Sequence, residues 1–418
     1  MIPAVQSVLD ALRPAFSRQR SFQLVAALLV ALLFAGKYTT LTTLFLQLDM
    51  LLPSLVRRYW SLTKMLARRR WDCQQLIILL LRFLVERLPD GMLLADVTHT
   101  TTQGRRQQGR HLRPNPHYRK CNQNQSKFWA GNSALSVAYA ATEQTRSGLR
   151  HWVFGLGCLL LMPSRRSGSE PAMLRRAISA IAPKGMLVVY DRGGNDAATI
   201  NCFTRRGLRF ITRLNANAAL YDDPGCRRKI DLWRYQRTFK RGTKTIYRYE
   251  ALCYRKKVRS QLKAVIEISY NRSKRDWRLS IYVSTDTTLS GEEIVTIYRT
   301  RCQIEGVHAD SKLVCGFNSC RLHSARAIEA YLSLSLMASG ILEYVRYSLR
   351  QTPQMSAGIS TLDIIETLGM HWYRPMRLTR GLTARYVEHR LHTDAEELST
   401  FRAYFSRHSA ASPCPTRN

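Results

Sequence analysis

The sequence predicts a mixed α/β fold in which a sheet core lies between two helical regions. Between residues 89 and 217, short apolar runs typical of buried strands alternate with helical segments. Two of these runs end in an acid, Asp96 and Asp191. Farther along the chain, Ser290 and Glu293 fit the S-x-x-E capping box that begins a helix. These observations predict a sheet, its covering helices and candidate functional acids in one core.

The first 88 residues look helical, because Leu, Ala and Arg dominate them. The run from Leu24 to Ala35 is wholly apolar and follows two arginines, so it superficially resembles a signal peptide. A membrane span needs about 20 apolar residues, and Lys37 ends this run too early. We therefore expect a buried helix and no membrane partner. The basic residues between 57 and 88 fit either a DNA-contacting helical module or a solvated helix face.

The core elements follow in order after Pro89. No Asp or Glu occurs from Val97 to Thr142, and the Gly-, Asn- and Gln-rich part of that stretch predicts a long polar loop. Ser169, Glu170 and Pro171 are typical of a helix start. The predicted series is a strand at 91–100, the loop, antiparallel strands at 128–142 and 149–162, a helix at 169–182, a strand at 184–191, a helix at 195–207 and a strand at 208–217.

Charge indicates the class of partner. The 418 residues carry a formal net charge of +35, and 45% of them are hydrophobic, which is enough for a sizeable core. So large a cationic excess favours a polyanion, and long nucleic acid is the commonest one. An ordinary basic surface and an anionic membrane are the alternatives.

Residues 218–288 concentrate this charge. Between Arg227 and Lys263 there are fourteen Lys or Arg against two acids, and aromatic residues alternate with the cations. Aromatics at period two predict strands with one basic face. An excess this one-sided favours a surface that follows phosphates over an ordinary solvated sheet face.

The stretch "IYRTRCQIEGVHADSKL" places an aromatic, two cations and a carboxylate at fixed spacing. We expect one helix from Gly291 through Lys312. On a wheel of about 100° per residue, Tyr298, Arg301, Glu305 and Lys312 fall within about 60° of each other. A salt-bridge ladder on a solvated face would explain the Arg301–Glu305 spacing equally well.

The two strand-end acids give Glu305 possible partners. Asp96 and Asp191 end neighbouring apolar strands, whose ends should meet at one edge of the sheet. A third acid on a helix packed there would complete an oxygen-ligand site, which selects Mg²⁺ or Mn²⁺. Two such ions about 3.5–4 Å apart can activate a water or a 3′-hydroxyl and stabilise the leaving oxygen of a phosphodiester.

Asp96, Asp191 and Glu305, with the pattern Tyr298-x2-Arg301-x3-Glu305-x6-Lys312, resemble the DDE triad and YREK signature of bacterial cut-and-paste transposases. The resemblance is to the insertion sequence four family and covers about residues 90 to 345. It implies a ribonuclease-H-like mixed-sheet core, and a β-rich insertion between the second Asp and the Glu, which matches 218–288.

The resemblance also implies roles for individual residues. The three acids would be catalytic and would hold two Mg²⁺ or Mn²⁺ ions, and the rest of the signature would bind phosphates near the cleaved DNA end. Trp277 would stack on a flipped base during hairpin formation, or is a plain strand aromatic. The implied phosphate-binding residues are Tyr298, Arg301 and Lys312.

Two alternatives concern the ligands themselves. Asp196 could replace Asp191, but it follows two glycines and is expected inside a helix cap. The ten cysteines lack a paired framework and are expected to be reduced thiols of a cytosolic protein. Zinc sites usually contain a tight CxxC-type knuckle, and none occurs around the neighbouring thiols and imidazoles Cys302, His308, Cys315, Cys320 and His323.

The expected function is cut-and-paste transposition by a homodimer that binds terminal inverted repeats and target DNA in the bacterial cytoplasm, associated with the nucleoid. A ribonuclease-H-like nuclease without strand transfer and a non-catalytic DNA-binding protein derived from a transposase remain alternatives. The predicted division is a helical DNA-binding region at 1–88, the first part of the core at 89–217, the basic insertion at 218–288, core completion with the signature helix at 289–345, and a helical region and tail at 346–418.

Overall fold

The computed structural model describes residues 2–33, 35, 40–51, 59–101, 107–114, 127–145, 148–162, 169–230, 247–271 and 276–350. Within these ranges a nine-stranded mixed sheet has the order β2-β3-β1-β5-β6-β9-β8-β7, and β4 also pairs with β3. The strands are β1 (Met92–Thr101), β2 (His111–Pro114), β3 (Phe128–Thr145), β4 (Gly148–Leu161), β5 (Leu187–Tyr190), β6 (Arg209–Leu214), β7 (Tyr247–Cys253), β8 (Leu262–Asn271) and β9 (Asp276–Ser284).

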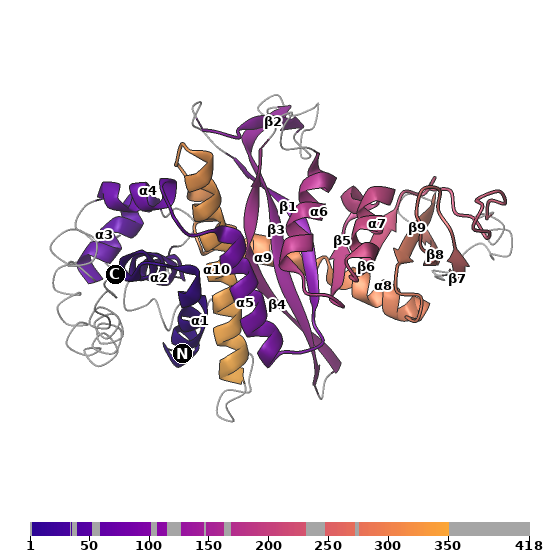
Figure 1. Ribbon diagram of the computed structural model, residues 1–418, viewed down its shortest axis with the longest axis horizontal. Helices are drawn as coiled ribbons and strands as arrows, with labels where there is room; N and C mark the ends of the chain where they lie inside the picture. The colour runs from indigo at the N-terminus through magenta and orange to yellow at the C-terminus, as the bar shows by residue number, and fades with distance from the viewer. Residues whose placement is uncertain are drawn as a thin grey trace, which may run out of the picture.

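The centre of the sheet is parallel and its flanks are antiparallel. β1 pairs with β5, and β5 with β6, in parallel. β3 runs antiparallel to both β1 and β4, and β9 runs antiparallel to β6. This mixed sheet, with helices around it, confirms the predicted α/β fold class (Figure 1). The short strand β2 lies inside the predicted polar loop, where no strand was expected.

Helices cover the sheet and extend the molecule on one side. α10 packs on β4, and α1, α2 and α4 pack in turn on α10 (Figure 1). α7 packs on β6, and α6 packs on α7. The helices are α1 (Ile2–Leu12), α2 (Gln19–Leu33), α3 (Leu41–Leu51), α4 (Tyr59–Ala67), α5 (Cys73–Arg87), α6 (Glu170–Ile181), α7 (Ala197–Arg205), α8 (Gly291–Thr300), α9 (Gln303–Leu313) and α10 (Ala325–Arg350).

The apolar N-terminal run is the buried helix that the sequence predicts. Every side chain of α2 from Phe22 to Leu33 is buried. Among the described helices, none combines the length and apolar character that crossing a membrane requires.

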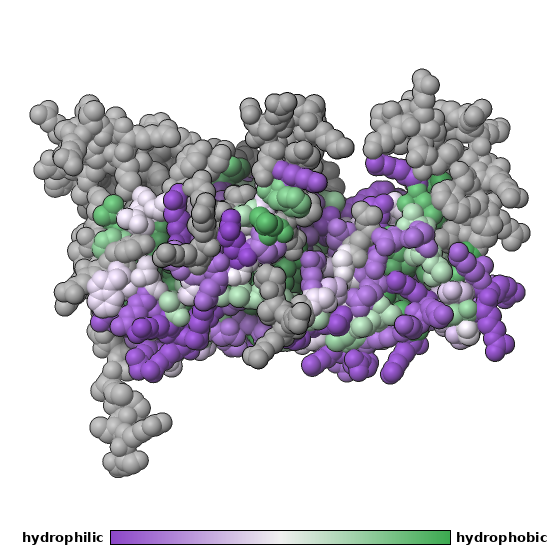
Figure 2. Space-filling model, turned by 90° about the horizontal axis from the view of Figure 1, so that it is seen from above, coloured by the Kyte–Doolittle hydropathy of each residue, from purple (hydrophilic) through white to green (hydrophobic). Residues whose placement is uncertain are grey.

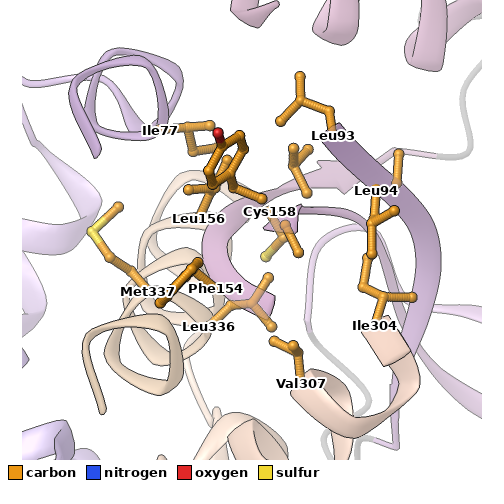
Figure 3. Close-up of a cluster of buried hydrophobic side chains, with 14 of the residues drawn as sticks. Ile77, Leu93, Leu94, Phe154, Leu156, Cys158, Ile304, Val307, Leu336 and Met337 are labelled. Atoms are coloured by element: carbon orange, nitrogen blue, oxygen red, sulfur yellow. The ribbon is translucent and has the colours of Figure 1, made fainter. Parts of the chain in front are cut away.

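One apolar cluster ties the signature segment to the sheet. Leu94 of β1 and Phe154 of β4 meet side chains from α9 and α10, and Ile77 of α5 joins them (Figure 3). Ile304 and Val307 are the members from α9. The burial of these side chains fixes α9 against β1 and β4.

The crossing of α10 over β4 is a close backbone approach. A β-carbon at Gly340 would lie 2.0 Å from the carbonyl oxygen of Gly155, and one at Gly155 would lie 2.4 Å from the carbonyl oxygen of Leu336. The register of β3 and β4 shifts at the same level, between Val137 and Ala138. Only glycine allows two backbones to approach this closely.

The predicted single helix from Gly291 to Lys312 is wrong, because it divides into α8 and α9. The capping box at Ser290 and Glu293 is present, as expected. At Arg301 and Cys302 the backbone N–H groups donate to carbonyls three residues back, at 3.1 Å, instead of four. This tightened turn lets α8 pack on β6 to β9 while α9 packs on β1 and β4.

The strands of residues 247–284 continue the core sheet. β9 pairs with β6, β8 with β9 and β7 with β8. The predicted boundaries of the insertion, and of the other domains, stay predictions.

Candidate active site

The sheet register places Asp96 beside Asp191. The parallel pairing of β1 and β5 ends with Ala95 opposite Tyr190, so the next residue of each strand is one of the two acids. Asp191 follows the end of β5, as predicted. Asp96 does not end its strand, because β1 continues to Thr101 against β3.

The turn between α8 and α9 aims the signature side chains at these acids. The hydroxyl of Tyr298 donates to Asp191 Oδ1 over 2.9 Å. Arg301 places Nη1 3.4 Å from Asp96 Oδ2 and Nη2 3.4 Å from Glu305 Oε1. The structure thus connects all three predicted carboxylates through one tyrosine and one arginine.

Glu305 lies at a helix start instead of in a helix interior. Because α9 begins at Gln303, Glu305 falls in its first turn. The Glu305 side chain is 63% exposed, whereas that of Arg301 is 11% exposed. Glu305 is therefore the accessible member of the three acids.

The acids and bases of the site influence each other. Burial raises the pKa of Asp96 to about 6; the charge of Arg301 and the N–H of Val97 oppose this, while Asp191 and Glu305 add to it. Burial alone would lower the pKa of Arg301. The negative charges of Asp191 and Asp96 outweigh the effect of burial and raise that pKa. The three acids therefore crowd negative charge around one guanidinium.

Lys312 also belongs to this electrostatic group. Burial lowers the pKa of the Lys312 ammonium, and the nearby charge of Asp96 opposes that shift. Lys312 lies in the last turn of α9. It is brought to the Asp96 side of the site, as the signature spacing predicts.

Tyr298 is buried and contacts other side chains of the protein. Its ring centroid lies 5.0 Å from that of Tyr282. Burial and the contact with Asp191 raise the pKa of the Tyr298 hydroxyl. Its predicted contact with phosphate, like those of Arg301 and Lys312, stays a prediction.

The oxygen donors suit a hard divalent cation, but an arginine lies between two of them. Among the described residues, no group of three or more His, Cys, Asp or Glu side chains is arranged to hold a metal ion. At this site the guanidinium of Arg301 bridges Asp96 and Glu305. Carboxylate oxygens are nevertheless the ligands that Mg²⁺ and Mn²⁺ prefer. An ion held by these acids requires Arg301 to release at least one of them.

Asp196 has a structural role. It is the N-cap of α7, where its carboxylate accepts hydrogen bonds from the backbone N–H and the hydroxyl of Thr199. Arg175 pairs with the same carboxylate at 3.2 Å. The expectation that Asp196 lies in a helix cap is confirmed.

Trp277 lies in β9, where its backbone pairs with that of Tyr270. Its side chain lies outside the described part of the structure, and its stacking role stays a prediction. Of the thiols near the signature, Cys315 and Cys320 are buried, and Cys302 is exposed.

The chain resembles known proteins over most of its length. Residues 93–341, more than half of the chain, match the family model described as the transposase DDE domain. This chain belongs to the DDE transposase family. No curated protein matches it. Among solved structures, it is similar to a piggyBac transposase in a synaptic complex with hairpin DNA, studied by cryo-EM, at 12% identity and a TM-score of 0.42, over 96% of this chain and 77% of that one.

Within the DDE domain, two polar residues that sequence reasoning missed lie directly behind the acids. His308 of α9 is buried, and its Nε2 lies 2.6 Å from the hydroxyl of Ser136 in β3. That hydroxyl donates to the main-chain carbonyl of Asp96 over 2.8 Å. The available signal was the position of His308, three residues after Glu305 and thus beside it on a helix.

Proposed function

We propose that this protein is a DNA transposase that excises and inserts an insertion sequence by metal-dependent cleavage and strand transfer. The single observation that carries the proposal is the convergence of Asp96, Asp191 and Glu305 on Arg301, within a DDE transposase domain. The YREK spacing supports a finer place in the insertion sequence four family of bacterial cut-and-paste transposases.

The three acids would hold the metal, and the bound ions, two in our proposal, would supply Lewis-acid activation of a water or a 3′-hydroxyl. Arg301 would then exchange a carboxylate for a phosphate, because its planar fork suits either partner. Lys312 would add a second cation on the Asp96 side. Tyr298 would hold Asp191 in place through its hydroxyl.

The DNA surface would extend over the strands that follow β6. Many of the described cations at this end of the molecule are exposed, and hydrophilic side chains gather there on the face seen in Figure 2. Such a cluster suits the phosphate backbone of a duplex. The exposed cations include Arg227, Arg228, Lys229, Arg248, Lys256, Lys257, Arg259 and Arg278.

The remaining parts of the proposal come from the family resemblance. The substrates would be terminal inverted repeats and target DNA, joined through a hairpin intermediate in which Trp277 stacks on a flipped base. Two subunits would pair the two DNA ends in the bacterial cytoplasm, associated with the nucleoid. The N-terminal helices would share in binding the repeats.

The test compares two aspartates that lie five residues apart. With Mg²⁺ and a duplex that carries the element's own terminal repeat, we expect Asp191→Asn to lose cleavage and to keep DNA binding. Glu305→Gln should behave in the same way. Asp196→Asn is the matched control, because asparagine also caps helices well, and it should cleave as the wild type does. Cleavage by Asp191→Asn at the wild-type rate would contradict the metal assignment.

Strand transfer distinguishes the transposase from its alternatives. A labelled, pre-cleaved end should become covalently joined to a target plasmid by the wild type. A nuclease of the same fold would cut the repeat but would leave the label unjoined. A non-catalytic DNA-binding protein would do neither, and its DNA binding would be unchanged by Asp96→Asn.

A further inference from the structure

A buried hydrogen-bonded chain links α9 to β1 behind the three acids. Ser136 Oγ is 2.8 Å from the Asp96 carbonyl oxygen and 2.6 Å from His308 Nε2. Because the hydroxyl proton is directed at the carbonyl, the hydroxyl oxygen must accept its second bond from an Nε2–H of histidine. The chain therefore joins the main chain of one acid to the helix that carries another.

Its location makes this link specific to the site. Asp96 and Ser136 face each other across the β1–β3 ladder, and the register shift of β3 begins at the next residue, Val137. His308 lies one helical turn after Glu305. The other contacts of α9 with the sheet in Figure 3, through Ile304 and Val307, are apolar and do not specify a direction.

We propose that His308 is a positioning residue, which acts through Ser136 to set the separation of Glu305 and Asp96 for metal binding. This inference rests on the proposed function. Once Arg301 releases a carboxylate, Coulomb repulsion between the acids would drive the exposed Glu305 outward, and apolar contacts alone would resist that motion weakly. A directed hydrogen-bond chain fixes the helix along its axis.

The charges around the imidazole agree with this role. Burial, together with the charges of Lys312, Arg301 and His99, lowers the pKa of His308 to about 3. The imidazole is therefore neutral at physiological pH and can keep a single proton on Nε2. A neutral donor adds no third positive charge beside Arg301 and Lys312.

The experiment measures Mn²⁺ binding to the full chain by the EPR signal of free Mn²⁺. His308→Phe keeps an aromatic ring but removes the donor, and we expect the Kd for Mn²⁺ to rise about 10-fold, as for other groups that orient metal ligands. His308→Gln, whose Nε2 can reach the same hydroxyl, should recover most of the affinity. Ser136→Ala should match His308→Phe, and the double variant should be no worse than either one.

Ser311→Ala is the matched control. Ser311 is also buried in α9, but its hydroxyl donates to the carbonyl of His308 in its own helix and does not reach β1. Its Mn²⁺ affinity should equal that of the wild type. If His308→Phe does not fold, the smaller change in Ser136→Ala still tests the link.

The positioning role of His308 and the proposed metal site can fail separately. Wild-type Mn²⁺ affinity in folded His308→Phe or Ser136→Ala, together with lost affinity in Asp96→Asn, would overturn the positioning role alone. Wild-type affinity in Asp96→Asn would instead overturn the metal site, and with it the proposed function.

Discussion

α9 and α10 cover the same part of the sheet by opposite means. α10 crosses β4 through backbone contact at Gly155 and Gly340, with apolar side chains around the crossing. α9 adds to its apolar contacts a buried histidine and the carboxylate of Glu305. The first crossing depends on a close approach of two backbones, whereas the second keeps a buried imidazole beside an exposed carboxylate. The difference separates the residues that hold the fold from those that the reaction needs.

The largest expected effect is at the α10 crossing. Gly340→Ala would place a methyl group 2.0 Å from the Gly155 carbonyl oxygen, and neither backbone can move aside cheaply. We expect a loss of about 4 kcal/mol or more in the free energy of unfolding, in the range of severe core substitutions. Urea unfolding followed by circular dichroism, with the soluble yield, measures it. An unchanged urea midpoint would mean that the two backbones are farther apart.

The next effect has the opposite sign and belongs to the site. Without metal, Asp96→Asn should be more stable than the wild type at pH 7.5 and should lose cleavage. The folded-state pKa of Asp96, about 6, lies above its ordinary value of 3.8. For an acid with a raised pKa, stability is lost as the pH rises through the folded value, so the full cost is present at pH 7.5. At about 1.4 kcal/mol per unit, the gain is on the order of 2–3 kcal/mol.

Thermal melting in EDTA measures this gain, and Asp286→Asn provides the contrast. Burial alone would raise the pKa of Asp286, but hydrogen bonds from Thr288 and the charge of Arg209 outweigh it, and the pKa is lowered. Its neutral variant should therefore melt below the wild type. A fall in melting temperature for Asp96→Asn in EDTA would show that the Asp96 carboxylate stabilises the fold.

The sequence predicted local features of the site better than features that depend on packing. The proximity of Asp96, Asp191 and the signature residues could be predicted because the signals are local: acids that follow apolar runs, and a fixed spacing in the sequence. The break at Arg301 was missed because it depends on which strands α8 and α9 pack against. β2 has only four residues, too few for a periodic pattern.

Contacts between distant parts of the chain could not be predicted from the sequence for the same reason. His308 and Ser136 are 172 residues apart, and a single buried histidine in a helix is ordinary in itself. Likewise, the importance of Gly155 and Gly340 follows only from their contact with each other, which the sequence does not show. The candidate site was therefore predicted in its acids and cations, but not in the contacts that hold them.

The smallest expected effect completes the comparison of the two helices. Gly306 lies in the interior of α9, and a β-carbon there would meet no atom within 4 Å. Gly306→Ala should raise the free energy of unfolding by about 0.5–1 kcal/mol, because alanine loses less backbone entropy in a helix. Urea unfolding beside Gly340→Ala measures it, and the two identical substitutions should shift the midpoint in opposite directions. A loss of stability at Gly306 would mean that the new methyl group meets neighbouring atoms, and that α9 is packed there as tightly as α10 is on β4.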